Sequence, residues 1–212
     1  MKFLWVILLA AGLWAGEFES AVADYEQGNY IKALDAFYVL AKEGHPKAQF
    51  NVGLIYANGK GVKRDMYQAM AWYKKAAEQN NAEAQYNLAK LISQRPDKGD
   101  PRAMKRVKYW YEKAAAGGQK EAVNNLALLY LTGRGVEKNK TKAFELFKKA
   151  AKMGDSAAQI NVALMYAWGK GIPSNKIKAY KNLKAALLQG RTEASPYLDR
   201  LCKENSWACQ NN

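Results

Sequence analysis

One phrase, first complete at residues 46–81, recurs along this 212-residue chain and constrains its fold more than any other feature. Ala48 returns as Ala84, Ala122 and Ala158, at spacings of 36, 38 and 36 residues. Other positions recur at the same spacings. They are the asparagines Asn51, Asn87, Asn125 and Asn161, a small residue that is Gly53 in the first copy, and the tyrosines Tyr56, Tyr130 and Tyr166. Three glycine pairs also recur, namely Gly59 and Gly61, Gly133 and Gly135, and Gly169 and Gly171. Self-similarity at such a period is the sequence signature of a repeat solenoid.

Each copy of the phrase reads as helix, glycine loop, helix. Apolar residues recur at helical spacing between Pro46 and Asn58, and proline suits the first helical position. Gly59 and Gly61 end this helix, and Asp65 can cap the next one. A single helix pair cannot bury its own apolar face, whereas stacked copies can. We therefore predict an all-α fold, a right-handed α-solenoid of stacked helix pairs.

The phrase A-x-x-N-[LV]-[GA]-x-x-Y-x-x-G-x-G-V, followed by a helix that ends in W-Y-K-K-A-A, resembles the Sel1-like repeat, a relative of the tetratricopeptide helix pair. The resemblance covers residues 18–190. It implies repeats at 46–81, 82–118, 119–154 and 155–190, between an N-terminal capping pair at 16–45 and a C-terminal capping helix with its tail at 191–212. Later helices are expected to start near Gly118, Asp155 and Ser174. The second copy lacks the glycine pair and has a loop two residues longer before Pro101, with no assigned role.

Residues 1–15 are interpreted as a secretory signal peptide. Lys2 is followed by an unbroken apolar run, Phe3–Ala15. A membrane span needs about 20 apolar residues, so a cleaved signal fits better than a retained anchor. Cleavage after Ala15 preserves the first helix, which we expect at 18–27, and we expect no stable membrane span afterwards. The protein is then periplasmic or secreted.

The chain has only two cysteines, Cys202 and Cys209, both in the tail beyond a helix expected at 193–204. An even cysteine count in an exported protein favours a disulfide, which would fasten the tail to the capping helix. The alternative is a redox or metal-binding pair. The spacing does not match Cys-x-x-Cys, and further ligands are lacking.

Little in the sequence points to catalysis or to a cofactor. The Gly-x-Gly loops lack a following Gly-Lys-Ser/Thr, so we interpret them as turns rather than phosphate-binding loops. His45, the only histidine, lies in a turn without a recurring acidic partner. We therefore expect no cofactor, no metal and no enzymatic activity. The recurring asparagines are expected to hydrogen-bond backbone between stacked helices.

The formal net charge is +14, and loss of Lys2 with the signal leaves +13. Such a charge favours acidic partners, including an acidic protein or an anionic cell-envelope polymer, or simply provides a solvated face. Nucleic acid is not expected, because no binding motif is present. We expect a monomer.

The resemblance implies an adaptor that holds a protein or peptide on its concave face. Alternatives are a cell-envelope enzyme, since some cysteine-rich Sel1-like proteins are described as penicillin-binding with weak β-lactamase activity, and a secreted host-interaction factor. The repeats here contain no cysteine. On the first helices of the pairs, the residues predicted to face a partner are Phe50, Leu54, Tyr86, Lys90, Asn124, Leu128, Ile160, Leu164 and Trp168, with Phe50, Tyr86 and Trp168 as aromatic anchors.

Overall fold

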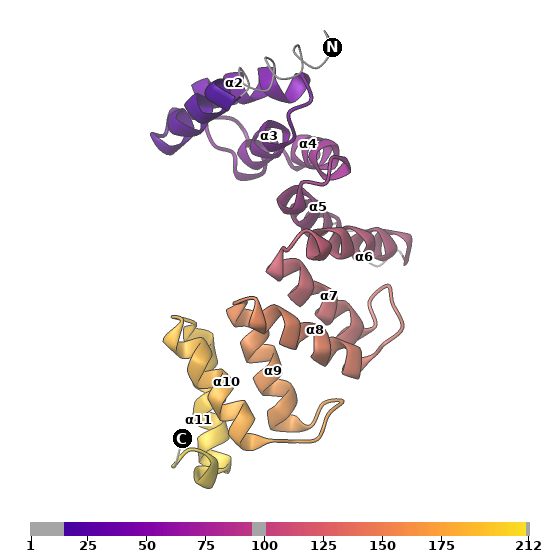
Figure 1. Cartoon of the computed structure of the whole chain (residues 1–212), viewed down its shortest axis with the longest axis vertical. Coiled ribbons are helices and arrows are strands. Elements are labelled where there is room, and N and C mark those ends of the chain that lie inside the picture. The colour runs from indigo at the N-terminus through magenta and orange to yellow at the C-terminus, as the bar shows by residue number, and fades with distance from the viewer. Residues whose placement is uncertain (1–14, 95–100, 211–212) are drawn as a thin grey trace, which may run out of the picture. The chain divides into compact units, whose positions relative to one another are not determined.

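The computed structural model describes residues 15–94 and 101–210, and every regular element in those residues is helical. The chain divides into two compact units, residues 1–95 and 96–212, each containing stacked helix pairs (Figure 1). The predicted all-α class and the stacked repeat pairs are confirmed. The proposed signal peptide lies outside the described residues except for Ala15, and most of the longer loop before Pro101 also lies outside them.

The first unit places each helix against the next one in the chain. Residues 15–26 are helical, and the following helices are α2 (Tyr30–Lys42), α3 (Pro46–Asn58), α4 (Met66–Glu78) and α5 (Ala82–Gln94). Its core consists of Ala21, Ala33, Leu34, Phe37, Leu40, Ala41, Ala48, Val52, Ile55 and Trp72. Buried alanines from several helices allow the helix backbones to approach closely, which explains the recurrence of small residues.

The second unit continues the same succession. Its elements are α6 (Pro101–Ala116), α7 (Lys120–Thr132), α8 (Lys140–Lys152), α9 (Ser156–Trp168), α10 (Lys176–Leu188), the short 3₁₀ turn η1 (Thr192–Ala194), α11 (Ser195–Glu204) and the 3₁₀ turn η2 (Ser206–Ala208). Each helix from α6 to α11 packs on its successor. The core around α9 to α11 consists of Ile160, Ala163, Ala167, Ala179, Leu183, Ala186, Ala194 and Leu201.

The glycine loop after α3 combines a turn with close packing. Gly59 has a φ of 67°, and its N–H donates to the Ile55 carbonyl, which closes the helix in the left-handed conformation that favours glycine. A Cβ on Gly61 would lie 2.9 Å from Tyr30 Cβ at the start of α2. The loop therefore packs back onto the preceding helix pair, and glycine is needed for space as well as for backbone conformation.

The second glycines of the two later loops, Gly135 and Gly171, repeat this arrangement. Both have a positive φ, of 71° and 82°, in agreement with their interpretation as turn residues. A Cβ on Gly135 would overlap Met104 near the start of α6, and a Cβ on Gly171 would overlap Lys140 at the start of α8. Each of these glycines therefore forms the turn and also lets its loop pack onto the second helix of the preceding pair.

Side-chain caps close the starts of several helices. Asp65 Oδ1 accepts hydrogen bonds from the Tyr67 and Gln68 N–H groups, as expected, at 2.9 and 3.0 Å. Asp155 Oδ1 accepts from the Ala158 N–H at 2.7 Å. The expected start at Ser174 is wrong by one residue, because Asn175 supplies the capping oxygen for α10. The start expected at Gly118 is also one residue early, since Gln119 is the N-cap of α7.

The recurring asparagines do not have the role that we expected. Asn87 Nδ2 donates to the Glu83 carbonyl within its own helix, and Asn125 Nδ2 donates to Tyr111 Oη at 3.2 Å. Backbone groups of the preceding helix are bonded instead by buried glutamines. Gln49 Nε2 donates to the Ala41 carbonyl at 3.1 Å, and Gln85 Nε2 donates to the Ala77 carbonyl at 3.0 Å. The buried glutamines therefore lie at the interface between pairs, whereas the recurring asparagines are only half-buried.

The C-terminal helix α11 covers α10 and is fastened to the tail. Leu201 is buried against α10, and Leu198 packs beside it. The predicted disulfide is present, with 2.06 Å between the sulfurs of Cys202 and Cys209. Within the described residues, no helix combines the length and the apolar character needed to cross a membrane.

Candidate partner-binding surface

The residues predicted to face a partner are divided between the two units. Phe50, Leu54, Tyr86 and Lys90 lie on α3 and α5 of the first unit. The remaining five lie on α7 and α9 of the second unit. Each unit therefore has to be judged by the exposure and contacts of its own residues.

Two of the candidates in the second unit are wrong because they are buried. Asn124 is 7% exposed, and its Oδ1 accepts a hydrogen bond from Asn161 Nδ2 at 3.0 Å. Ile160 is 8% exposed and belongs to the core formed with Leu183. Both lie on the flank of their helix that faces another helix, where helical spacing alone does not separate a buried position from an exposed one.

Leu128 and Trp168 are the exposed large apolar candidates in the second unit, each 37% exposed, and Leu164 is half-buried between these extremes. Leu128 lies on α7, whereas Leu164 and Trp168 lie on α9. An exposed tryptophan at a position occupied elsewhere by Asn58 and Thr132 is not required by the repeat framework. Aromatic side chains of this kind provide large contact area at interfaces.

The capping helix α11 adds residues to the Trp168 surface that the sequence did not suggest. The Tyr197 ring lies 6.4 Å from the Trp168 ring, centroid to centroid, in an edge-on arrangement. The Arg200 guanidinium carbon lies 5.6 Å from the centroid of the same ring, and Lys170 Nζ lies 5.7 Å from it. Cations at such distances are attracted to the face of an indole ring. Trp168, Tyr197 and Arg200 thus form an aromatic and cationic surface, called here the Trp168 surface.

In the first unit, the predicted aromatic anchors are tied to the fold. The Phe50 ring lies 5.7 Å from the ring of Tyr73, which is buried, and Phe50 is itself half-buried. Leu54 and Tyr86 are half-buried as well, and Lys90 is exposed. None of these four candidates is therefore an exposed large apolar side chain.

His45 has a structural role. Its Nδ1 accepts a hydrogen bond from the Ala48 N–H at 3.2 Å and so caps α3, while its ring stacks on Phe18 at 4.9 Å. Burial, and secondarily the Lys47 ammonium, lower the pKa of His45 below its usual value. The neutral imidazole is the form that can accept this hydrogen bond, so the protonation state and the cap agree.

In the part of the chain that the structure describes, His, Cys, Asp and Glu side chains nowhere gather in a group of three that could hold a metal ion. Burial raises the pKa of the Asp155 carboxyl, but this side chain is engaged in capping α9. The second unit has two surface features of interest. One is the Trp168 surface, and the other is a groove between α8 and α10 that is lined by Lys148, Lys152, Lys178 and Lys181.

These stacked helix pairs with glycine-closed loops define a helical repeat protein. The Sel1 repeat model matches residues 46–81, 82–119, 120–155 and 156–190, which is more than half of the chain. The chain belongs to the Sel1 repeat family. Proteins with these repeats generally mediate protein–protein interaction, and the repeat scaffold is typically non-catalytic.

Solved structures of similar proteins agree with this family. A protective antigen of uropathogenic Escherichia coli with an SLR fold has a TM-score of 0.82 and 31% sequence identity, over 90% of this chain and 42% of that one. A Sel1 repeat protein from Oxalobacter formigenes has a TM-score of 0.75 and 30% identity, over 85% of this chain and 75% of that one.

Similarity to characterised proteins is more local. Chitin synthase regulatory factor 3 of Schizosaccharomyces pombe is 38% identical over 60 residues, which is 28% of this chain and 6% of that protein. This chain thus spans a small part of that relative and less than half of the Escherichia coli antigen.

Proposed function

We propose that this protein is an exported, non-catalytic scaffold that binds a protein or peptide partner through Leu128 and the Trp168 surface. The observation that carries the proposal is the exposure of Leu128 on α7 and of Trp168 on α9, two large apolar side chains at positions predicted to face a partner. Large apolar side chains left accessible on a rigid repeat framework are typical of interaction surfaces. The cations that flank Trp168 suit a partner carrying carboxylates next to an apolar side chain.

The disulfide between Cys202 and Cys209 supports the exported location. Disulfides persist in oxidising compartments and are rare in reducing ones. The bond closes a short loop next to α11, the helix that supplies Tyr197 and Arg200 to the Trp168 surface. Export and binding are therefore linked in the proposal, because the oxidised tail helps to hold the helix that completes the surface.

Partner capture with a matched pair of variants tests the proposal. The disulfide-bonded protein is immobilised and exposed to cell-envelope extract. The retained partner protein is identified and purified, and its dissociation constant is measured. Leu128→Ser with Trp168→Ala should weaken binding about tenfold or more, since truncation of a buried aromatic anchor costs roughly 2 kcal/mol or more.

The control variant carries the same two substitution types elsewhere in the second unit, Leu188→Ser with Trp207→Ala. These two side chains are more exposed than the originals, at 82% and 58%. It should bind like the unchanged protein. Equal binding by both double variants would place the partner elsewhere and reject the Trp168 surface.

A further inference from the structure

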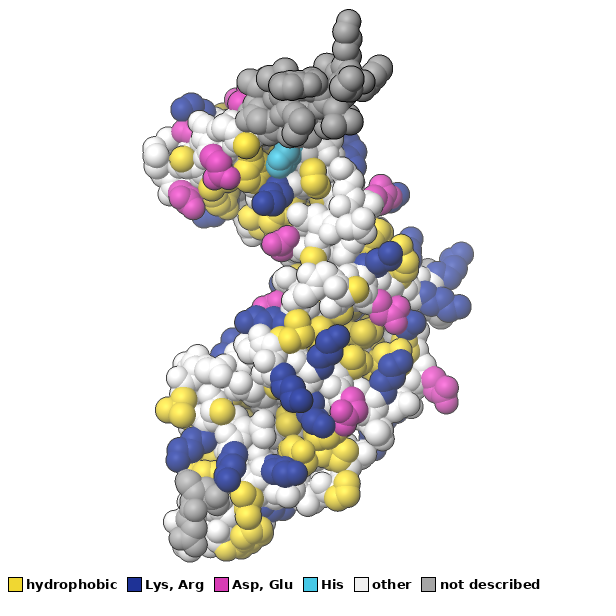
Figure 2. Space-filling model, in the orientation of Figure 1, with side chains coloured by type: hydrophobic (Ala, Val, Ile, Leu, Met, Phe, Trp, Pro, Cys, Tyr) yellow, Lys and Arg dark blue, Asp and Glu magenta, His cyan; other side chains and the backbone are white. Residues whose placement is uncertain are grey.

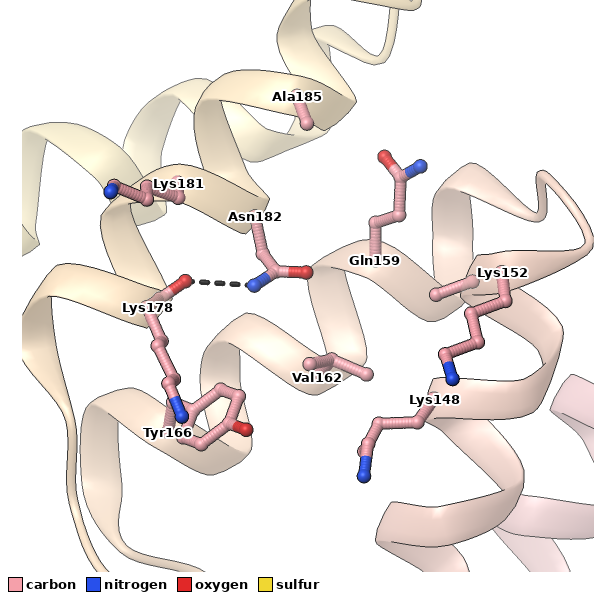
Figure 3. A pocket seen from close by; sticks show the side chains of 10 residues that line it. Lys148, Lys152, Gln159, Val162, Tyr166, Lys178, Lys181, Asn182 and Ala185 are labelled. Atoms are coloured by element: carbon pink, nitrogen blue, oxygen red, sulfur yellow. Dashed lines mark hydrogen bonds between the residues drawn. The ribbon is translucent and has the colours of Figure 1, made fainter. Parts of the chain in front are cut away.

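A groove with a lysine-rich rim lies in the second unit between α8 and α10, with α9 as its floor (Figure 3). Its volume is about 400 Å³, within the usual range of ligand-binding clefts. Lys148 and Lys152 line it from α8, and Lys178 and Lys181 line it from α10. Lysine and arginine side chains are also prominent on the second unit in the view of Figure 2, between patches of hydrophobic side chains.

The positive charge of this rim is only partly compensated. Lys148 Nζ lies 3.3 Å from Glu145, an exposed pair, and Lys178 Nζ lies 5.4 Å from the centroid of the Tyr166 ring. Among the described residues, neither Lys152 nor Lys181 has an acidic partner, and no Asp or Glu lines the groove. Lys181 lies at the rim with its ammonium turned away from Gln159 (Figure 3), where it adds to the field around the groove.

The repeat framework does not require two of these lysines. At a spacing of 36 residues, the positions of Lys152 and Lys181 are occupied in the preceding helices by Ala116 and Glu145. Lys148, in contrast, recurs as Lys74 and Lys184 and belongs to the repeated phrase itself. Lysine at positions 152 and 181 is therefore a feature of this groove and not of every copy of the repeat.

The floor of the groove contains an acceptor without a donor. Gln159 Oε1 is buried and has no hydrogen-bond partner within the described part of the chain. In the first repeat, the equivalent Gln49 Oε1 accepts from Gln79 Nε2 at 2.8 Å. A buried acceptor without a partner is costly, so a donor from a bound molecule would stabilise this site. Val162 and Tyr166 provide apolar surface beside it.

From these features we infer that the groove between α8 and α10 is a second binding site, and that its ligand is an acidic peptide segment. Carboxylates of such a segment meet the lysine ammonium groups, an apolar side chain covers Val162, and a backbone N–H donates to Gln159 Oε1. A polyphosphate would satisfy the lysines alone, because it has neither N–H donors nor apolar side chains. The peptide is therefore the ligand class that fits the whole lining.

The groove is separate from the Trp168 surface and independent of the function proposed for that surface. With 3.6 residues per helical turn, Gln159, Val162 and Tyr166 share one side of α9. Leu164 and Trp168 lie on the opposite side of the same helix. A ligand in the groove leaves the Trp168 surface uncovered, so substitutions can remove either site alone.

Selection from a random octapeptide display library on the intact, disulfide-bonded protein tests the inference. Enriched peptides should combine Asp or Glu with an apolar residue. Their affinity should fall about tenfold or more in Lys148→Glu with Lys152→Glu, since reversing charges at a complementary contact replaces attraction by repulsion. The control Lys138→Glu with Lys149→Glu changes the net charge equally, at exposed positions of the same unit that do not line the groove. It should bind almost normally.

A second variant separates a directional site from general charge attraction. Gln159→Leu keeps the size and removes the acceptor, so selected peptides should bind several-fold more weakly while the melting temperature is retained. Inorganic polyphosphate is the comparison ligand. The inference is overturned if no acidic peptides are enriched, if both charge-reversal variants lose binding alike, or if Gln159→Leu leaves peptide binding unchanged and polyphosphate competes fully. The variant with Leu128→Ser and Trp168→Ala should bind the selected peptides normally. A failure of the groove inference can therefore be told apart from a failure of the function proposed for the Trp168 surface.

Discussion

Replacing Gly53 by alanine should destabilise the first unit, although alanine is the better helix former. Gly53 lies inside α3, where a Cβ would be 2.7 Å from Tyr73 Cδ1 and 2.8 Å from Tyr73 Cε1. The Tyr73 ring is 2% exposed and lies against Phe50, so it has little room to retreat. Overpacking of this kind costs about 1–3 kcal/mol, against a gain of about 1 kcal/mol in helix propensity. We expect a net loss of up to about 2 kcal/mol.

The other repeats supply the matched control. The positions equivalent to Gly53 and Tyr73 are Ala163 and Leu183 in the last repeat, where both are buried and the smaller partner leaves room for the methyl group. In a Tyr73→Leu background, Gly53→Ala should therefore be neutral or stabilising by up to about 1 kcal/mol. Urea unfolding read by hydrogen exchange of the α3 and α4 amides reports on this unit. A stabilising Gly53→Ala in the unchanged chain, or an equal cost in both backgrounds, would refute the packing argument.

Three further predictions concern single contacts. The folded state lowers the pKa of His45, so the unfolded chain takes up the proton first as the pH falls below about 6.5. The free energy of unfolding should therefore decrease below that pH. His45→Asn should keep the cap on α3 and remove this part of the pH dependence of the melting temperature. Asp155→Ala should cost about 1 kcal/mol through loss of the cap on α9, whereas Asp155→Asn should cost much less, and equal losses in denaturant titrations would contradict the capping role. Replacing Cys202 and Cys209 by serine should weaken the tail by about 2 kcal/mol, seen as faster hydrogen exchange in α11 with little change in α7.

The repeat architecture could be predicted from the sequence because local signals recur in phase. Pro46 begins a helix, Asp65 caps the next one, and Gly59 adopts the left-handed conformation that ends α3. Each of these features depends on neighbours within a few residues along the chain. The disulfide was predictable for a different reason, since two cysteines allow only one pairing within the chain.

The contacts between helices could not be read in this way. Spacing placed Asn124 and Ile160 on the same face as Leu128 and Trp168, yet packing buries the first two and leaves the others accessible. A helix has flanks that are buried or exposed according to which neighbour covers them, and that neighbour is distant in sequence. For the same reason, the recurrence of the asparagines does not show that the glutamines make the bonds to the preceding helices.

The sequence by itself thus determined the class of the fold, the capping residues Asp65 and Asp155, and the glycine that ends α3, because these depend on local backbone chemistry. Only the tertiary structure decided which side chains a partner can reach. It placed Tyr197 and Arg200 of α11 beside Trp168, and it placed the lysines of α8 and α10 around the acceptor of Gln159. Surfaces are made by the packing of separate helices, and a single helical period does not encode that packing.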